Sequence, residues 1–416
     1  RVVAAARRRR WISGNFSPSV SSGELGLARG ISKGVDPAQT ISDCGHREIR
    51  GTLHFAADRI SQMGDMRRQH SLWFKVGVVA TAVGEGPRTV LLRVDLDALP
   101  VQERSDAPYA SQVSGVMHAC GHDGHVTVAL GIIRHLQEEN WPRNGCGEIL
   151  FFFQPAEEGG AGAKAMLDTG YFDGEPVTAI FAGHMDPELP VGKIELISGT
   201  AHAATNTLRI RIKGKGGHGA SPHLCIDPIV AGAHLVTQLQ TFVSRNLAPL
   251  DSAVLTIGEF HAGTKENIIP EEAHLLGTLR TLSPEIRTLA IRRIEEMVGG
   301  LDLTFGVTTI FENIEGYPSQ TNDTGLRECI KLCAEDVLGS AGVHIGRPHM
   351  GAEDFSYFCQ KWPGAMIGLG CHDPAKGFQY PLHSPHFEMD ERILDVGVRL
   401  FGHALVRFLE KGSLET

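Results

Sequence analysis

Three short segments of nearly continuous apolar residues most constrain how this chain can fold. Residues 89–94, 148–153 and 178–182 have the length of strands and carry apolar side chains on both faces. Strands of this kind are typical of a parallel sheet that is covered on both sides by helices. Apolar residues spaced by three and four over residues 126–136 predict one such helix directly after Cys120. We therefore expect an α/β domain with a mostly parallel, helix-flanked sheet.

The middle third of the chain has a different pattern. Residues 207–213 alternate between apolar and basic side chains, which predicts a strand with one buried and one wet face. Further strands are predicted at 253–260, 273–280 and 303–311, and helices at 227–245 and 285–298. This order, β-α-β-β-α-β, is that of the split, ferredoxin-like unit. We expect it to form a small α+β domain inserted into the α/β domain.

The predicted domain boundaries follow from this change of pattern. The larger domain comprises residues 46–202 and 314–416, and the inserted domain comprises residues 203–313. The larger domain is expected to begin with a helix near His46 and a strand at 76–82, and to resume after the insertion with helices at 323–338 and 390–410 around a strand at 365–369. Residues 1–45 show no periodicity, and we interpret them as irregular or atypical.

Composition and charge exclude several classes of protein. The chain has 416 residues, of which 42% are hydrophobic and 21% are charged, as in an ordinary two-domain globular protein. No apolar run reaches the ~18 residues that cross a bilayer, so we expect no membrane partner. The net charge of -9 repels phosphate backbones, so we expect no nucleic-acid partner. The eight cysteines are scattered rather than arranged as a disulfide framework. With no secretory signal, the expected location is cytoplasmic, although the early arginines would also suit a mitochondrial-type presequence.

The segment richest in reactive side chains is Met-His-Ala-Cys-Gly-His-Asp-Gly-His at residues 117–125. It places a thiol and three imidazoles immediately before a predicted helix, and both groups are ligands of zinc and similar divalent ions. The positive end of the helix dipole should lower the pKa of the Cys120 thiol and so favour the metal-binding thiolate. A surface loop that happens to be rich in histidine is the alternative, and the segment alone leaves both open.

Three further segments carry ligand-type side chains at or near the ends of predicted strands. Glu157 and Glu158 follow the strand at 148–153, His184 follows the strand at 178–182, and His383 comes shortly after the strand at 365–369. Ligands of open α/β sheets bind at the carboxyl ends of the strands. An acidic turn or a structural histidine would explain each segment separately. Because four segments converge on one sheet, a metal site is the simpler explanation, and their separation disfavours a structural zinc knuckle.

Eight sequence motifs carry a family resemblance. They are RVDLDALP (93–100), MHACGHDGH (117–125), FQPAEEG (153–159), GKGGHGASP (214–222), NIIP (267–270), GTLR (277–280), GAEDFSYF (351–358) and LHSP (382–385). In order and spacing they resemble the amidohydrolase branch of the aminoacylase/carboxypeptidase-type dinuclear metallopeptidases. That branch includes N-acyl-amino-acid amidohydrolases, hippurate hydrolases and indoleacetyl-amino-acid hydrolases. The resemblance extends from about residue 76 to residue 410.

The resemblance implies two divalent metal ions per subunit, with zinc or manganese expected first and cobalt or nickel as alternatives. It assigns the ligands to Cys120, whose thiolate bridges the two ions, and to His122, Glu158, His184 and His383. Glu157 matches the general base, and Asp97 matches a carboxylate that orients a ligand imidazole. A cap for the turn after the strand is the other interpretation of Asp97. His118 and His125 flank the ligands, and we interpret them as supporting or structural residues.

The resemblance also implies that the inserted domain forms a homodimer through residues 203–313 and closes over the site. His218 matches a histidine that reaches the active site of the partner subunit, and Asn267 and Arg280 match groups that hold the carboxylate of the substrate. A guanidinium suits this task because its donors fit two carboxylate oxygens. Without the resemblance, these residues would be interpreted as a surface histidine, a turn asparagine and a strand arginine facing water.

The implied activity is metal-dependent hydrolysis of the amide bond of an N-acyl amino acid, with a metal-activated water and Glu157 as the general base. A dipeptidase-like or carboxypeptidase-like exopeptidase and a non-catalytic metal-binding homologue are the alternatives. The enzyme is favoured because Glu157 and all five implied ligands are present. The acyl group, the amino acid and the metal stay open. The start of the chain lacks the His-x-x-Pro-Glu-Leu string of the family, which indicates either a sequence error or a divergent extension.

Overall fold

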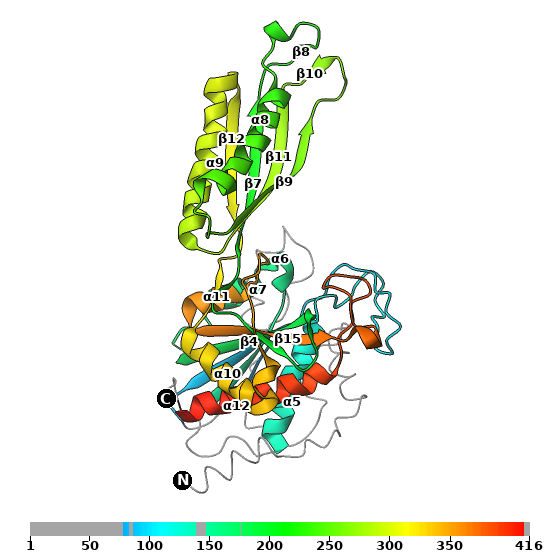
Figure 1. The fold of residues 1–416 in the computed structure, drawn as a ribbon, viewed down its shortest axis with the longest axis vertical. Coiled ribbons are helices and arrows are strands. Elements are labelled where there is room, and N and C mark those ends of the chain that lie inside the picture. Colours follow the sequence, from blue (N-terminus) through cyan, green and yellow to red (C-terminus); the bar gives the residue numbers. More distant parts are fainter. Residues whose placement is uncertain (1–77, 83–85, 139–146, 175, 412–416) are drawn as a thin grey trace. The chain divides into compact units, whose positions relative to one another are not determined.

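The computed structural model describes residues 78–82, 86–138, 147–174 and 176–411 (Figure 1). The predicted helix near His46 and the irregular segment 1–45 lie outside these residues. The chain divides into two compact units. The inserted unit comprises residues 200–320 and 348–356, and the large unit comprises the other described residues. The inserted unit therefore begins before and ends after the range predicted from the sequence, 203–313, and includes one additional segment.

The large unit is built on a seven-stranded sheet of strand order β1-β3-β2-β4-β15-β5-β14 (Figure 1). The strands are β1 (Val78–Ala82), β3 (Glu148–Gln154), β2 (Thr89–Asp95), β4 (Val177–Pro190), β15 (Gly364–His372), β5 (Ile194–Leu196) and β14 (Val343–Ile345). Its four central strands, from β3 to β15, run parallel, while β1 is antiparallel to β3 and β5 is antiparallel to β15. The prediction of a mostly parallel sheet is confirmed.

Helices cover both faces of this sheet (Figure 1). On one face lie α5 (His122–Glu138), α10 (Thr324–Leu338) and α12 (Arg392–Lys411), and on the other lie α7 (Gly162–Asp168) and α11 (Phe355–Lys361). Of the apolar stripe predicted for α5, Val126, Ala129 and Leu136 are buried, and Leu130 and Ile133 are partly buried against the same core. Helices α5 and α12 approach each other closely at Gly131, where a Cβ would lie 2.5 Å from Cγ2 of Val398. No helix in the described part of the chain is long and apolar enough to span a bilayer.

The inserted unit has the predicted β-α-β-β-α-β order (Figure 1). Its elements are β7 (Ala204–Lys213), α8 (Pro228–Thr241), β9 (Ala253–Ala262), β11 (Glu272–Thr281), α9 (Pro284–Phe305) and β12 (Thr308–Glu315). The four strands form an antiparallel sheet of order β12-β7-β11-β9, and the buried side chains of β7 face α8 and α9. A short antiparallel pair of β8 (Gly217–His218) and β10 (Ile268–Ile269), two strands far apart in the sequence, is added to this plan.

One predicted element of the inserted unit is wrong at its start. The sequence predicted a strand over 303–311, but α9 continues to Phe305 and the strand β12 begins at Thr308. Leu301 continues the buried stripe that includes Met297, so packing continues past the predicted end of the helix at residue 298. Gly306 then ends the helix in the left-handed conformation, with φ 71°.

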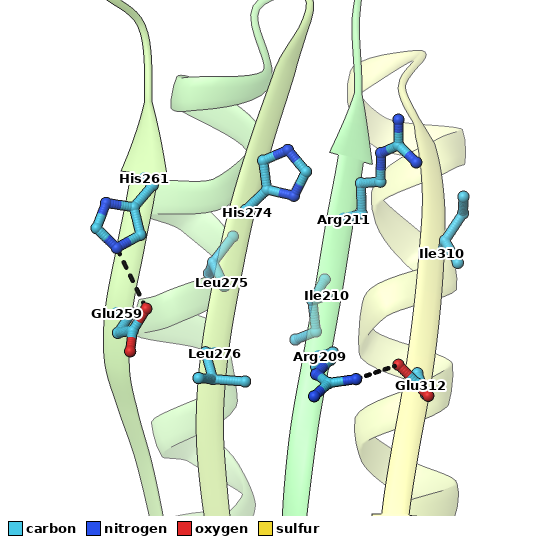
Figure 2. A pocket seen from close by; sticks show the side chains of 10 residues that line it. All are labelled: Arg209, Ile210, Arg211, Glu259, His261, His274, Leu275, Leu276, Ile310 and Glu312. Atoms are coloured by element: carbon cyan, nitrogen blue, oxygen red, sulfur yellow. Dashed lines mark hydrogen bonds and ion pairs between the residues drawn. The ribbon is translucent and has the colours of Figure 1, made fainter. Parts of the chain in front are cut away.

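The open face of the inserted sheet contains a shallow hollow of about 420 Å³. Figure 2 shows that some of its charged lining residues pair with one another, either between neighbouring strands or within one strand. Arg209 contacts Glu312 at 3.3 Å and His261 contacts Glu259 at 3.2 Å. Arg211 and His274 pair instead with Glu272, outside the lining. Because these charges are paired and none of the predicted site residues lines the hollow, we assign no chemistry to it.

Candidate metal centre

A tight turn at the start of α5 brings Cys120 and His122 towards β4. Gly121 makes this turn with φ 83°, and a Cβ at this position would lie 2.9 Å from Cβ of Met185. Both the backbone conformation and the close approach require glycine. Cys120 and His122 are both buried at this turn.

The five side chains predicted as metal ligands lie together, in two groups that share one atom. The ligand atoms of Cys120, His122 and His184 lie within 4.8 Å of one another, and so do those of Cys120, Glu158 and His383. Sγ of Cys120 lies 3.5 Å from Nε2 of His184 and 3.3 Å from Nε2 of His383. A thiolate in this position could serve both groups at once, as a sulfur bridging two ions would.

Two of the imidazoles are held through the nitrogen that faces away from the thiol. Nδ1 of His122 donates to the main-chain oxygen of Asp97 at 3.0 Å, and Nδ1 of His184 donates to the main-chain oxygen of Met185 at 2.8 Å. A carbonyl oxygen only accepts, so Nδ1 carries a proton in both rings. Nε2 is therefore the nitrogen that each ring offers to a cation, which is the usual arrangement of metal-bound histidines.

Two buried atoms at the centre lack a hydrogen-bond partner within the described residues. They are Nε2 of His122 and Oε1 of Glu158; the latter lies 3.1 Å from Nε2 of His383 without hydrogen-bond geometry. Burying such atoms unpaired costs about 1–3 kcal/mol each. A bound cation would accept their lone pairs, and the mixture of sulfur, nitrogen and carboxylate oxygen suits zinc or a similar divalent ion. The residues present therefore fit a metal centre.

Burial and neighbouring charges set the protonation of these groups when no metal is bound. Burial raises the pKa of the Cys120 thiol to about 12. The expectation of a lowered pKa is therefore wrong for the metal-free thiol, because the loss of hydration on burial is the largest effect on it. Burial alone would lower the pKa of His122, but the charge of Asp95 and the nearby carboxylate of Asp97 hold this pKa well above its ordinary value. Burial holds the pKa of His184 well below its ordinary value, so of these two imidazoles only His122 favours its charged form. A metal that binds here displaces the protons of Cys120 and His122.

The two adjacent glutamates are held by Asp97. Its carboxylate accepts the main-chain N–H of Glu157 at 3.0 Å and that of Glu158 at 2.9 Å. The turn before them is strained, since Ala156 has φ 56°. The imidazole of His122, predicted to be oriented by the Asp97 carboxylate, lies 3.4 Å from that carboxylate and hydrogen-bonds the main-chain oxygen of Asp97 instead. Asp97 thus ties the predicted base and two predicted ligands to one turn.

His184 lies within a strand, and His383 lies in a loop. The sequence placed His184 after a strand that ends at residue 182, but β4 continues to Pro190 because β15 pairs with it through His184 and beyond. His383 lies in the loop after β15 and has φ 65°, a conformation that non-glycine residues rarely adopt. Its N–H donates to the main-chain oxygen of Ala119 at 2.7 Å, which ties this loop to the segment that carries Cys120.

The three predicted site residues of the inserted unit do not lie together. His218 and Asn267 are neighbours, because β8 pairs with β10 and the N–H of Gly219 donates to the oxygen of Asn267 at 2.9 Å. Arg280 lies near the other end of β11, where it pairs with Thr205 at the start of β7. The eight residue steps from Glu272 to Arg280 span about 27 Å in an extended strand. Within one chain, Arg280 is therefore far from the other two.

Comparison with known proteins places the chain in a family. Residues 91–407 match the model of peptidase family M20/M25/M40. The chain belongs to this family. It is 38% identical over 361 residues to the N-acetyldiaminopimelate deacetylase of Brevibacillus brevis and 39% identical over 362 residues to that of Bacillus subtilis; each alignment covers 86% of this chain and 93% of the relative.

Solved structures agree with this membership. A Bacillus subtilis protein, described as a dinuclear metal-binding peptidase of the M20 family, has a TM-score of 0.72 at 29% identity and covers 93% of this chain and 98% of its own. A Staphylococcus aureus structure has a TM-score of 0.81 at 29% identity and covers 93% of this chain and 96% of its own. The predicted family and fold are confirmed, and the chain is a metal-dependent hydrolase of amide bonds.

Proposed function

We propose that this enzyme removes the acetyl group from an N-acetylated amino acid, with N-acetyldiaminopimelate as the first substrate to test. The observation that carries the proposal is the pair of ligand groups that share Cys120, next to the carboxylate of Glu157. The relatives reported above are N-acetyldiaminopimelate deacetylases, which favours an acetyl group over the benzoyl and indoleacetyl groups that the sequence motifs also allow.

Two divalent ions would be held by Cys120, His122, Glu158, His184 and His383. When bound, they supply Lewis acidity that polarises the amide carbonyl and lowers the pKa of a water. Zinc or manganese is the first choice for this donor set, and cobalt or nickel are the alternatives. Because Cys120 belongs to both groups, its loss should weaken both ions, whereas loss of His383 should weaken one.

Glu157 is the proposed general base. Its side chain is 7% exposed, and a carboxylate oxygen of Glu157 lies within 4.8 Å of the ligand atoms of His122 and Glu158. It would take a proton from the attacking water and return it to the leaving nitrogen. A C–O bond forms, the amide C–N bond breaks, and the products are acetate and the free amino group.

The proposed enzyme is a homodimer that shares its active site between chains. Arg280 lies far along the sheet from His218 and Asn267, so these three residues cannot surround one substrate unless a second chain supplies some of them. Strands β9 and β12 are the two edges of the inserted sheet and offer unpaired backbone groups to a second copy. The proposed arrangement is that His218 of one chain contacts the substrate bound at the metal centre of the other.

A substrate panel tests the proposed function. We expect the zinc-loaded or manganese-loaded enzyme to hydrolyse N-acetyldiaminopimelate with a higher kcat/KM than N-benzoylglycine, an indoleacetyl amino acid or a dipeptide with a free amino group. The same panel after chelation is the control. A preference for the dipeptide would establish an exopeptidase instead, and no hydrolysis by the metal-loaded protein would favour the non-catalytic alternative.

A further inference from the structure

We propose that His125 is a positioning residue, which fixes the metal-facing orientation of His184 by holding the main chain of Met185. We further propose that a buried ion pair between Arg93 and Asp95 holds His125 in the tautomer that this role requires. This inference rests on the proposed metal centre. It concerns residues that the sequence motifs left without a specific role.

The hydrogen bonds of His125 determine its tautomer. Its side chain is buried; Nδ1 lies 2.5 Å from Oδ1 of Asp95, and Nε2 lies 2.9 Å from the main-chain nitrogen of Met185. An N–H can only donate, so Nε2 of His125 must be the acceptor and carries no proton. The ring proton is therefore on Nδ1, where it is donated to Asp95.

Both backbone groups of Met185 are bonded to imidazoles. Its N–H donates to His125, and its carbonyl oxygen accepts the Nδ1 proton of His184 at 2.8 Å. The two rings lie close to each other, with centroids 4.9 Å apart and an interplanar angle of 63°. A shift of the Met185 main chain would therefore move the carbonyl that orients His184, and with it the Nε2 that faces Cys120.

The other end of this chain of contacts is an ion pair inside the sheet. Nη1 of Arg93 donates to Oδ2 of Asp95 at 2.8 Å, and the two side chains are 1% and 0% exposed. Nε of Arg93 donates to Oε1 of Gln154 on the adjacent strand β3, also at 2.8 Å. A buried charge is tolerated only when it is paired and hydrogen-bonded, and here the pairing with Arg93 fixes the carboxylate of Asp95 next to His125.

A third metal ion does not explain this cluster, although Asp95, His122 and His125 all carry ligand-type atoms within 4.8 Å of one another. Two ligand atoms of one tetrahedral zinc lie about 3.3 Å apart, given bonds of about 2.0–2.2 Å. Nδ1 of His125 and Oδ1 of Asp95 are closer than that, at 2.5 Å, so a proton rather than an ion lies between them. The remaining nitrogen of His125 is used by Met185.

Two substitutions of His125 separate its two contacts. In His125→Gln, the amide oxygen can reach the position of Nε2 and accept from Met185. In His125→Asn, the shorter amide can replace Nδ1 at Asp95 but cannot reach Met185. We expect His125→Asn to bind one of its two ions about 10–100-fold more weakly than wild type, as for other residues that orient metal ligands. We expect His125→Gln to hold both ions nearly as tightly as wild type.

The measurement is metal content per chain after dialysis against a dilute chelator, with affinities from competition against a chromophoric chelator. His184→Asn and His383→Asn are matched controls, each removing one ligand from one group. His125→Asn should resemble His184→Asn in losing the ion held by Cys120, His122 and His184. Thermal unfolding identifies any variant that does not fold; if His125→Asn fails to fold, retention of both ions by His125→Gln supports the inference.

Unchanged affinity in folded His125→Asn overturns the inference, and so does equal loss of an ion in both His125 variants. Neither outcome touches the proposed function, because wild type would still bind two ions. If wild type itself binds no metal, the proposed metal centre is wrong and the inference falls with it.

Discussion

Replacement of Glu157 by glutamine should leave both metal ions bound while kcat for amide hydrolysis falls by about 10²–10⁴-fold. Glutamine cannot take the proton of the attacking water, yet it keeps the size of the side chain. Glu158→Gln is the matched variant at the next position. It should lose metal as well as activity, because Glu158 belongs to a ligand group with Cys120 and His383. Elemental analysis and steady-state kinetics on the same preparations separate the two roles.

The two glutamates make this comparison sharp because their main chains are held alike. Both N–H groups donate to the carboxylate of Asp97, so neither substitution removes a backbone anchor. If Glu157→Gln loses metal and Glu158→Gln retains it, the two roles have been exchanged. Equal metal loss in both variants would show that Glu157 is a ligand rather than a base.

Mixing two inactive variants, His218→Ala and Glu157→Gln, should restore about a quarter of wild-type activity after subunits exchange. A twofold dimer with random pairing contains one mixed dimer in two. Each mixed dimer has one site in which an intact Glu157 meets an intact His218 from the other chain, and one site that lacks both. The hydrolysis rate of the mixture is compared with that of each variant alone.

Each variant alone should stay inactive before and after the exchange procedure, and this is the control. Subunit exchange is monitored separately, with chains that carry different affinity tags. If exchange is complete and no activity returns, then His218 acts within its own chain or has no role in hydrolysis. If the His218→Ala variant is active on its own, then His218 has no role in the active site.

Much of the fold could be predicted because burial on both faces leaves a simple pattern in a strand. The apolar residues of β2, β3 and β4 could only belong to a covered sheet, and the alternation in β7 marked the half-exposed sheet of the inserted unit. Element ends were less predictable. The end of α9 depends on which residues pack against the sheet, and the length of β4 depends on its pairing with β15.

The metal ligands could be proposed from the sequence, but their grouping could not. Four separate segments carry them, and only the folded chain shows that Cys120 belongs to two groups of three. Local patterns also misjudged the Cys120 pKa, since the helix start is visible in the sequence and the depth of burial is not. For the contacts that hold His125, the sequence offered one signal, because Arg93 is a charged residue in an otherwise apolar strand. The structure alone shows that Asp95 and Gln154 are its partners.

Titration of metal-free protein with zinc or manganese tests most directly whether the Cys120-linked groups form the active centre. Bound metal per chain and the initial rate of N-acetyldiaminopimelate hydrolysis are measured on the same samples. We expect no hydrolysis without metal, saturation of binding at two ions per chain, and full activity only when both are bound. Full hydrolysis by thoroughly metal-free protein would contradict a catalytic metal centre at Cys120, His122, Glu158, His184 and His383.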